Sequence, residues 1–444
     1  MAGADRPVAH GVSDREPTEA GSAGSAGSAE THRAIEAVWR IESARIIAGM
    51  ARMVGDISLA EEFAQDALVA ALEQWPRTGI PRNTGAWLTA AAKRRAIDHW
   101  RRQERLGVKY QEIAHRLHTD GPTGQPEAAV DEPIDDDLLR LIFVSCHPVL
   151  SRQARVSLTL RLLGGLTTDE IARAFLVPSS TIGQRIVRAK KTLSAANVPF
   201  EVPGRDEFAG RLDSVLEVIY LVFNEGYAAT AGDDWMRPEL CQEAMRLGRV
   251  LAGLVPKQAE VHGLVALMEL QASRIHARTS SSGEPILLLD QDRSRWDQLL
   301  IRRGLAALDR AKSLGGATGA YALQAAIAAC HARASSPDQT DWERIVALYD
   351  ALTQLHPSPV VELNRAVAVS MAYGPAAGLE LVDELAEGGQ LVEYHLLPSV
   401  RADLLQKLGR AGEARTEFER AASMAHNERE RALLRERAAA VELL

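Results

Sequence analysis

The stretch between Glu170 and Glu201 is the part of the sequence best suited to bind a polyanion. It contains arginines and lysines but no acidic residue. Such cations pair with nucleic-acid phosphates, and the release of counterions makes the binding strong and salt-dependent. The cations suited to phosphate contacts are Arg185, Arg188, Lys190 and Lys191. Ser180 and Gln184 carry hydroxyl and amide groups of the kinds that contact base edges.

The same stretch has the pattern of a helix-turn-helix, in which the second helix enters a DNA groove. Ile182, Ile186, Ala189 and Leu193 recur at helical spacing and form one apolar stripe. The polar residues are thereby left on the opposite face. An ordinary helical hairpin with a solvated basic face is the alternative interpretation.

A second basic block runs from Trp87 to Arg105, where cations alternate with tryptophan and isoleucine. This composition allows phosphate contacts and base stacking together. Tryptophans are, however, more often core residues than base-stacking groups. The cations of the block are therefore better functional candidates than its aromatic residues.

Length and composition limit the class of protein. A chain of 444 residues exceeds one hydrophobic core, so several domains are expected. No apolar run reaches the length of a membrane span, and the first residues lack the apolar segment of a signal peptide. We therefore expect a cytoplasmic protein without a membrane partner. The net charge of −8 argues against nonspecific coating of nucleic acid.

Signs of enzymatic or metal chemistry are few. The sequence has no phosphate loop and no HExxH motif, and its histidines are scattered. Cys146, Cys241 and Cys330 lack the paired spacing of a zinc site or a disulfide framework. We predict buried thiols, no catalytic residue, no metal and no cofactor, and hence a protein that is not an enzyme.

Apolar spacing predicts an all-α chain with five parts. A Gly-, Ser- and Ala-rich stretch, Gly21–Ala29, predicts a flexible tail over 1–31. Helical units are expected over 32–117 and 138–197, separated by an acidic linker over 118–137 that is rich in Gly and Pro. A helical extension over 198–444 completes the chain.

The extension contains weak internal repeats. Residues Ala402–Ala421 have the helix–turn–helix pattern of a tetratricopeptide (TPR) unit, with small residues where paired helices approach closely. A weaker copy covers Ala366–Leu385, and Ala322–Leu355 predicts another helical pair. We therefore describe the extension as TPR-like.

Three of these segments resemble a known family. Asp56–Trp75 resembles the polymerase-binding helix of sigma region two, and Trp87–Arg102 resembles its promoter −10 element helix. Leu138–Leu193 resembles sigma region four, whose helix-turn-helix reads the −35 element. Their order and spacing are those of extracytoplasmic-function sigma factors of the sigma-70 family. Leu221–Tyr227, Asp290–Asp297 and Pro357–Ala368 resemble the extension of one sigma subgroup.

The resemblance implies roles for particular residues. It assigns to core polymerase the residues Glu62, Gln65, Asp66 and Val69. It assigns to the −10 element the residues Lys93, Arg94, Arg95, Asp98, His99, Trp100, Arg101 and Arg102, where Arg94 replaces a common asparagine. It assigns to the −35 element the residues Ser179, Ser180, Thr181, Gln184, Arg185, Arg188, Lys190 and Lys191.

One further feature concerns the start of the recognition helix, and two others have two interpretations each. Pro178 replaces the usual serine cap of the recognition helix, so Ser179 or Ser180 could cap a helix that starts later. Asp131 through Asp137 either mimic nucleic-acid charge in the polymerase's RNA-exit path, as the resemblance implies, or are only solvated. The densest polar cluster of the extension either caps a helix and forms internal salt bridges or serves as a regulatory interface. It consists of Asp290, Asp292, Arg293, Arg295, Trp296 and Asp297.

The favoured interpretation is a transcription initiation factor. It would bind core RNA polymerase and promoter DNA, recognise the −35 and −10 elements and promote melting. Its extension would regulate this activity through contact with the sigma regions. The alternative is a helix-turn-helix regulator that binds an operator and carries a TPR-like sensor or scaffold. The two differ in whether Asp56–Trp75 binds polymerase.

Overall fold

The computed structural model describes residues 22–104, 131–175, 177–229, 235–281, 283–389 and 391–441. Helices account for every named element of these residues, and one isolated bridge joins Thr279 and Pro285. The predicted all-α fold is confirmed. The chain divides into two compact units, residues 1–42 with 62–120 and residues 43–61 with 121–444.

The first three helices are α1 (Ser22–Val54), α2 (Ile57–Thr78) and α3 (Thr84–Glu104). Within the first unit, α2 and α3 pack through aromatic rings. Buried Trp75 meets Trp87 edge to face with centroids 5.3 Å apart, and Phe63 meets His99 at 5.4 Å. Trp87 is therefore part of the packing, which agrees with the core interpretation of the tryptophans.

The start of α1 differs from the sequence prediction. We predicted a flexible tail over residues 1–31, but α1 begins at Ser22. Extending an existing helix by a residue is far less costly than nucleating one, so a small-residue stretch can continue a stable helix. The remainder of the predicted tail, residues 1–21, lies outside the described residues.

Four helices follow in the second unit: α5 (Asp131–Ser145), α6 (Arg152–Leu162), α7 (Thr168–Phe175) and α8 (Ser179–Ala195). Most of the predicted linker lies outside the described residues, but its last part begins α5. Asp137 is only 2% exposed and accepts from Arg52 and Arg140 at 2.9 Å each. Both interpretations of the linker, charge mimicry in an RNA-exit path and simple solvation, are therefore wrong for Asp137, because it is buried and two internal cations bind it.

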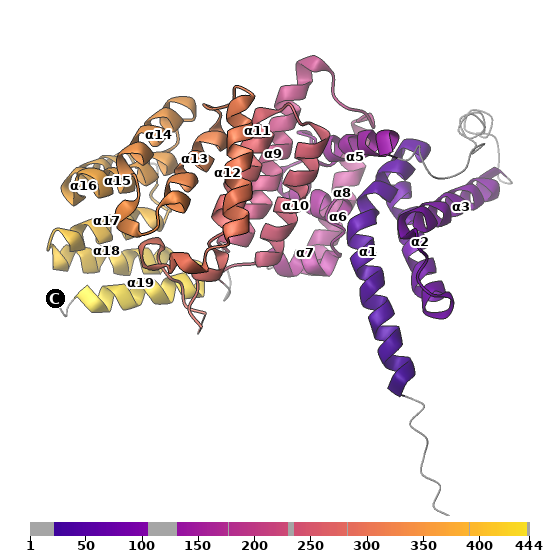
Figure 1. Cartoon of the computed structure of the whole chain (residues 1–444), viewed down its shortest axis with the longest axis horizontal. Coiled ribbons are helices and arrows are strands. Elements are labelled where there is room, and N and C mark those ends of the chain that lie inside the picture. Colours follow the sequence, from indigo (N-terminus) through magenta and orange to yellow (C-terminus); the bar gives the residue numbers. More distant parts are fainter. Residues whose placement is uncertain are drawn as a thin grey trace, which may run out of the picture. The chain divides into compact units, whose positions relative to one another are not determined.

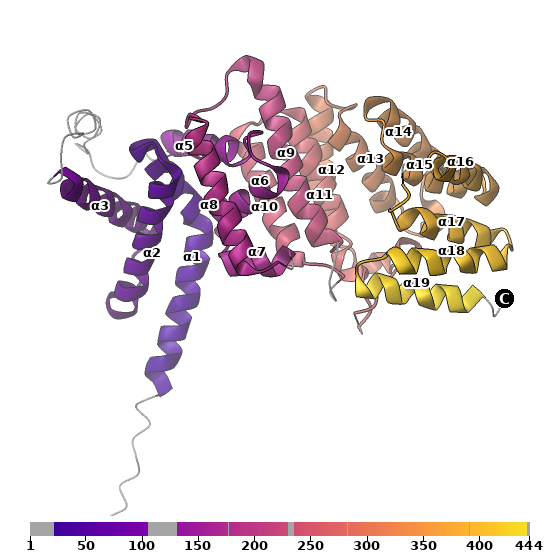
Figure 2. The ribbon, with the colours of Figure 1, turned by 180° about the vertical axis from the view of Figure 1, so that it is seen from behind.

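The extension is a succession of helices that pack against their neighbours in the chain (Figures 1 and 2). Short 3₁₀ turns interrupt it, namely η1 (Ile275–Ala277), η2 (Leu288–Asp290), η3 (Arg293–Arg295) and η4 (Pro337–Gln339). The helices are α9 (Arg205–Tyr227), α10 (Pro238–Leu254), α11 (Ala259–Ala272), α12 (Gln298–Ser313), α13 (Ala320–Arg333), α14 (Trp342–Leu355), α15 (Pro359–Tyr373), α16 (Pro375–Glu387), α17 (Leu396–Lys407), α18 (Ala411–Met424) and α19 (Glu428–Ala440).

The predicted helical pairs are present in this succession. The clearest, α17 with α18, turns at Gly409, whose φ of +74° lies in the left-handed region that glycine adopts without strain. Ala402, Ala414 and Phe418 are fully buried in the core between the two helices and α19. The small residues of the repeat pattern therefore mark close helix packing.

Helix α9 of the extension packs directly against α6 and α5. The Ser214 hydroxyl donates to the Cys146 carbonyl at 2.7 Å, and Phe143 meets Phe208 with ring centroids 5.4 Å apart. Arg246 of α10 donates to the Leu163 carbonyl at 2.6 Å. The start of the extension and the helix-turn-helix segment thus share one packed core.

The three cysteines are buried free thiols, as predicted. Burial raises the pKa of Cys146 to about 11 and that of Cys241 to about 12. Both thiols therefore stay protonated at neutral pH. Among the helices that the structure describes, none combines the length and apolar character needed to cross a bilayer.

Candidate nucleic-acid interface

Helix α8 has the two faces that its sequence predicts. Ile182, Ile186, Ala189 and Leu193 are its buried residues. The other face exposes Ser180, Gln184, Arg188 and Lys191, while Ser179, Thr181 and Arg185 are half-buried. The apolar stripe holds the helix in place and leaves the polar groups directed outward.

The turn before α8 fixes where that helix begins. Helix α7 starts with a capping box, in which Thr167 and Glu170 each accept from the other's backbone N–H, at 2.8 and 3.1 Å. Helix α8 begins at Ser179 with Pro178 as N-cap, and no side chain caps it. The expectation that Ser179 or Ser180 caps a later start is wrong. Since φ of Pro178 is −57°, its ring is compatible with a helix that begins at the next residue.

Lys190 lies apart from the exposed cations of α8. Its ammonium pairs with Glu61, a carboxylate that also accepts from Arg161 Nε at 2.6 Å. Glu61 is 5% exposed. Burial opposes its ionisation, but Lys190 and Arg161 outweigh burial and hold its pKa below the ordinary value. Lys190 therefore forms an internal ion pair, in contrast to its predicted phosphate contact.

Sequence reasoning missed Glu61, although a signal was present. Ala60, Ala64 and Ala67 are fully buried at helical spacing on α2. Glu61 is three residues before Ala64 and therefore shares the buried face. A buried carboxylate requires cationic partners, which lie far along the chain at Arg161 and Lys190.

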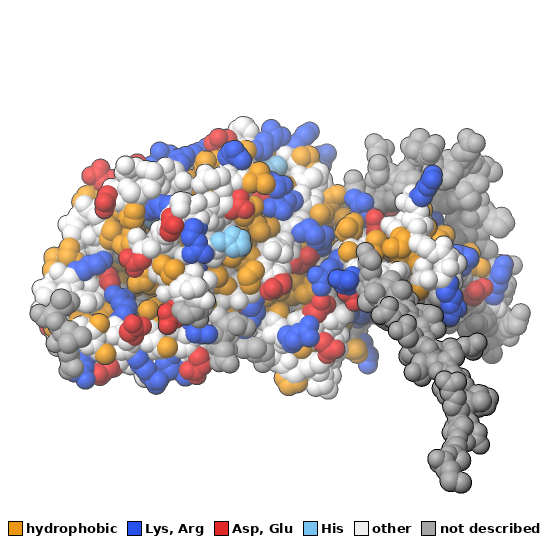
Figure 3. All heavy atoms as spheres, turned by 60° about the horizontal axis from the view of Figure 1, so that its bottom comes forward, with side chains coloured by type: hydrophobic (Ala, Val, Ile, Leu, Met, Phe, Trp, Pro, Cys, Tyr) orange, Lys and Arg blue, Asp and Glu red, His pale blue; other side chains and the backbone are white. Residues whose placement is uncertain are grey.

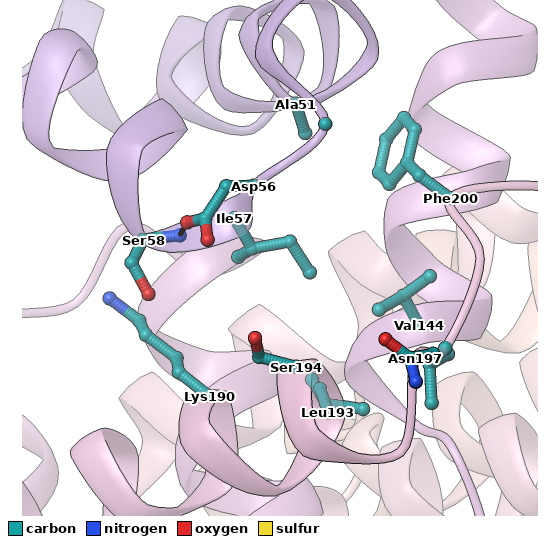
Figure 4. Close-up of a pocket in the computed structure, with 12 residues that line it drawn as sticks. Ala51, Asp56, Ile57, Ser58, Val144, Lys190, Leu193, Ser194, Asn197 and Phe200 are labelled. Atoms are coloured by element: carbon teal, nitrogen blue, oxygen red, sulfur yellow. Dashed lines mark hydrogen bonds between the residues drawn. The ribbon is translucent and has the colours of Figure 1, made fainter.

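A pocket of about 280 Å³ lies beside this ion pair. Figure 4 shows Asp56 and Ser58 at the start of α2 on one side, and Lys190 and Ser194 of α8 on the other. The Asp56 carboxylate caps α2 by accepting from the N–H groups of Ser58 and Leu59 at 2.7 and 3.0 Å. Lys190 is the only predicted DNA-contacting residue among those that line this pocket.

Helix α3 presents a second exposed basic face. Lys93, Arg94 and Arg95 are exposed in succession, and Arg101 is exposed near Asp98, 4.0 Å away. The half-buried ring of His99 packs on Phe63, and Trp100 is also half-buried. Arg102 belongs to α3, but its side chain lies outside the described residues.

The residues predicted to bind polymerase share one face of α2. Glu62, Gln65, Asp66 and Val69 follow the spacing i, i+3, i+4, i+7. Glu62 and Val69 are exposed, and Gln65 and Asp66 are half-buried. The carboxylates of Glu62 and Asp66 make this face a poor match for nucleic-acid phosphates, in contrast to the exposed cations of α3 and α8.

The polar cluster of the extension is largely structural. Asp297 caps α12 by accepting from Leu299 and Leu300, and Asp292 caps η3 by accepting from Ser294. Arg293 donates to three acceptors and Trp296 is 3% exposed. These four residues are used in capping and packing, whereas Asp290 and Arg295 remain exposed.

The face in Figure 3 carries cationic and anionic side chains in alternation over the extension. A large field of one sign is absent from this view of the described side chains. Among the described residues, no group of three or more His, Cys, Asp or Glu is arranged so that it could hold a metal ion. Over the extension, this face therefore mixes both signs of charge, in contrast to the local runs of exposed cations on α3 and α8.

Comparisons with known proteins agree with this geometry. Residues 42–106 match the family model for sigma-70 region 2, and residues 140–193 match that for sigma-70 region 4. Residues 211–312 match a family of unknown function (DUF6596). No solved structure matches the chain.

Two relatives show how far the similarity extends. An uncharacterized protein of Rhizobium meliloti is 45% identical over 395 residues, which cover 88% of this chain and 91% of that protein. A probable ECF RNA polymerase sigma factor, SigI of Mycobacterium tuberculosis, is 27% identical over 199 residues, which cover 42% of this chain and 68% of that protein. The chain belongs to the extracytoplasmic-function sigma factors of the sigma-70 family and carries a helical C-terminal extension.

Proposed function

We propose that this sigma factor binds core RNA polymerase in the cytoplasm, recognises the −35 and −10 promoter elements and promotes melting, while its extension regulates these steps. No bond chemistry is required of the chain itself. The observation that carries the proposal is the presence of exposed basic faces on both α3 and α8, each within a matched sigma region.

On α8, Ser180 and Gln184 are proposed to contact base edges of the −35 element, with Ser179 and Thr181 at the same end of the helix. Arg185, Arg188 and Lys191 are proposed to pair with phosphates. These three cations have no carboxylate partner among the described residues, so no internal ion pair has to break before DNA binds. Lys190 would have to leave Glu61 to do the same.

On α3, the cations Lys93, Arg94, Arg95 and Arg101 are proposed to contact the −10 element, together with Arg102. Asp98, His99 and Trp100 complete the proposed surface. His99 is supported from below by Phe63, so its position is fixed before DNA arrives. Such fixed groups lose less entropy on binding than free side chains do.

The α2 face with Glu62, Gln65, Asp66 and Val69 is proposed to bind core polymerase. Its test is the substitution of Gln65 and Asp66 by alanine, with Gln74→Ala as an exposed control on the same helix. The double variant should lose copurification with core polymerase and run-off transcription, and the control should keep both. Copurification that survives the double substitution would favour an operator-binding regulator instead.

The extension is proposed to regulate region 4 through the α6–α9 contact, in place of a separate anti-sigma protein. Glu217 of α9 supports this proposal, because it pairs with Arg152 at 2.5 Å and with Arg155 at 3.2 Å. Glu217→Arg should change run-off yield while leaving the DNA-contacting residues intact. Adding Arg152→Glu should restore the wild-type yield; equal yields from all three proteins would contradict this regulation.

We also propose that the extension is TPR-like. Its exposed polar residues, Asp290 and Arg295, are proposed to contact a regulatory partner. The helix pairs α13 with α14, α15 with α16, and α17 with α18 support the TPR-like character. A charge-reversed Arg295 should alter run-off yield if that residue contacts a regulatory partner.

A further inference from the structure

A second cavity lies among the helices of the extension, and it shares no lining residue with the pocket beside α8. Its volume is about 280 Å³. Residues of α9, α11, α13, α14 and α15 line it, together with Leu288 of η2 and Arg274 just after α11. The volume is near the lower end, roughly 300 Å³, of small-molecule sites in proteins.

Arg274 is the only Asp, Glu, Lys or Arg among the residues that line this cavity. Its Nη2 donates to the Tyr227 hydroxyl at 2.5 Å, and its guanidinium lies 5.8 Å from the ring centroids of both Tyr227 and Trp296. These contacts fix the orientation of the guanidinium. They use few of its N–H donors, since a guanidinium has five.

The charge of Arg274 is not neutralised within the described structure, where no carboxylate lies within salt-bridge distance of it. Arg278 and Arg293 also lack a carboxylate partner in the described structure, but they donate to backbone carbonyls and do not line the cavity. Two other arginines of the extension lie near a carboxylate. Arg249 pairs with Glu269 at 2.7 Å, and Arg303 lies 3.9 Å from the same carboxylate. An oriented cation without an anionic partner, at the wall of a cavity, is suited to an anionic ligand.

The surroundings of His331 also suit an anionic ligand in this cavity. Its Nδ1 is buried and has no hydrogen-bond partner in the described part of the chain, and its ring packs on Trp342 at 5.2 Å. Burial, then Arg274 and Arg293, lower the pKa of His331 to about 4, so the ring is neutral at pH 7. A neutral ring leaves Arg274 as the only charged residue among those that line the cavity, and it supplies a further polar atom for a ligand.

The rest of the lining is neutral and partly flat. Gln271, Gln324 and Asn364 supply amide groups. Tyr220 and Tyr349 supply aromatic rings, and the Tyr220 hydroxyl donates to Gln324 Oε1 at 3.2 Å. Aromatic walls with a few convergent polar groups are typical of sites for small organic molecules.

The geometry points to a binding site for a small organic anion, a carboxylate attached to a flat apolar group. The carboxylate pairs with Arg274, the amides and His331 orient it, and the apolar group lies between the tyrosines and the aliphatic lining. This inference does not depend on promoter recognition or polymerase binding. Its failure and the failure of the proposed function are therefore distinguishable.

Calorimetric titration of the full chain, without polymerase or DNA, tests the site with three probes of nearly the same shape. Benzoate is anionic, benzamide is neutral and benzylammonium is cationic. Benzoate should bind with a Kd on the order of 1 mM, as is usual for so small a ligand. The other two should bind about tenfold more weakly or not at all, because they cannot form the charge-assisted pair with Arg274.

Two variants place the binding at this cavity. Arg274→Gln should weaken benzoate binding about tenfold or more. The matched control is Arg302→Gln, an exposed arginine of α12 outside the cavity, and it should bind as the wild type does. Ala328→Trp keeps every polar group but fills the cavity with an indole, and it should abolish binding. Circular dichroism checks that each variant is folded.

Several results would overturn the inference. They are equal binding of benzoate and benzamide, unchanged binding by folded Arg274→Gln, and binding that survives in folded Ala328→Trp. The absence of any benzoate binding by the wild type at about 10 mM, ten times the expected Kd, would also overturn it.

Discussion

The cations of α8 and those around Trp296 in the extension are the same residue types in opposite surroundings. Arg188 and Lys191 are exposed and have no carboxylate partner in the described structure. Arg293 donates to the carbonyls of His331 and Ala334 at 2.8 and 2.7 Å and to the Thr340 hydroxyl at 3.1 Å. The partners of a cation, more than the local density of cations, therefore distinguish a binding surface from a structural one.

Lys190 and Glu61 show that the distinction applies within a single helix. Lys190 is next to Lys191 in sequence, yet it pairs with Glu61 and is 16% exposed. A dense basic run therefore contains both kinds of cation. Substitutions of exposed cations and of internally paired cations should therefore have different effects on DNA binding and on stability.

The largest effect is expected from Arg188→Glu combined with Lys191→Glu. The affinity of the polymerase–sigma complex for promoter DNA should fall about 100-fold or more, because two phosphate contacts become repulsions. Filter binding at several salt concentrations measures the affinity and its salt slope, which should decrease in magnitude. The free energy of unfolding should change by less than about 1 kcal/mol, since neither side chain has an internal partner.

The matched control for that pair reverses Arg302 and Arg435, two exposed arginines of the extension to which no role in binding or regulation is assigned. Promoter affinity should be unchanged in this protein. An equal loss of affinity in both double variants would mean that the total charge, rather than the α8 face, determines binding.

The next effect is expected from Arg293→Ala. The substitution leaves two carbonyls and a hydroxyl without their donor, so the extension should lose about 3 kcal/mol of unfolding free energy. Urea unfolding followed by circular dichroism measures it. Arg295→Ala, two residues away and exposed, should change stability by less than about 0.5 kcal/mol. Equal effects would show that Arg293 is not a structural cation.

Glu61→Gln should cost about 2 kcal/mol at neutral pH, because Arg161 and Lys190 lose their shared counterion. The pKa of Glu61 is held below its ordinary value of 4.5 in the folded chain. Its stabilising effect is therefore present above pH 4.5 and is lost as the pH falls through the folded-state pKa. Unfolding curves of wild type and variant should converge in acid; a constant gap down to pH 3 would contradict the ion pair.

The smallest effect concerns the turn between α17 and α18. Gly409→Ala should cost about 1 kcal/mol, because alanine is strained at a φ of +74°. Gly412→Ala lies within α18, where the added methyl group meets no atom within 4 Å, and it should stabilise by about 0.5 kcal/mol or more. Differential scanning calorimetry measures both changes. An unchanged stability of Gly409→Ala would contradict the requirement for glycine at this turn.

Most helices and their buried faces could be predicted from local sequence pattern. The spacing of Ile182, Ile186, Ala189 and Leu193 predicted the buried stripe of α8, because a helix repeats every 3.6 residues whatever it packs against. The pattern of Ala402–Ala421 likewise predicted a helix pair, which the structure has as α17 and α18. These are local properties, determined by residues within a few turns of one another.

The partners of the buried polar residues could not be predicted in this way, because they lie far away along the chain. Glu61 and Lys190 are 129 residues apart, and Arg293 donates to acceptors 38, 41 and 47 residues further along the chain. The cavity beside Arg274 likewise joins five helices that are separate in sequence. Local periodicity carries no information about such pairings. They follow from how helices pack and from the free energy needed to bury a charge without a partner.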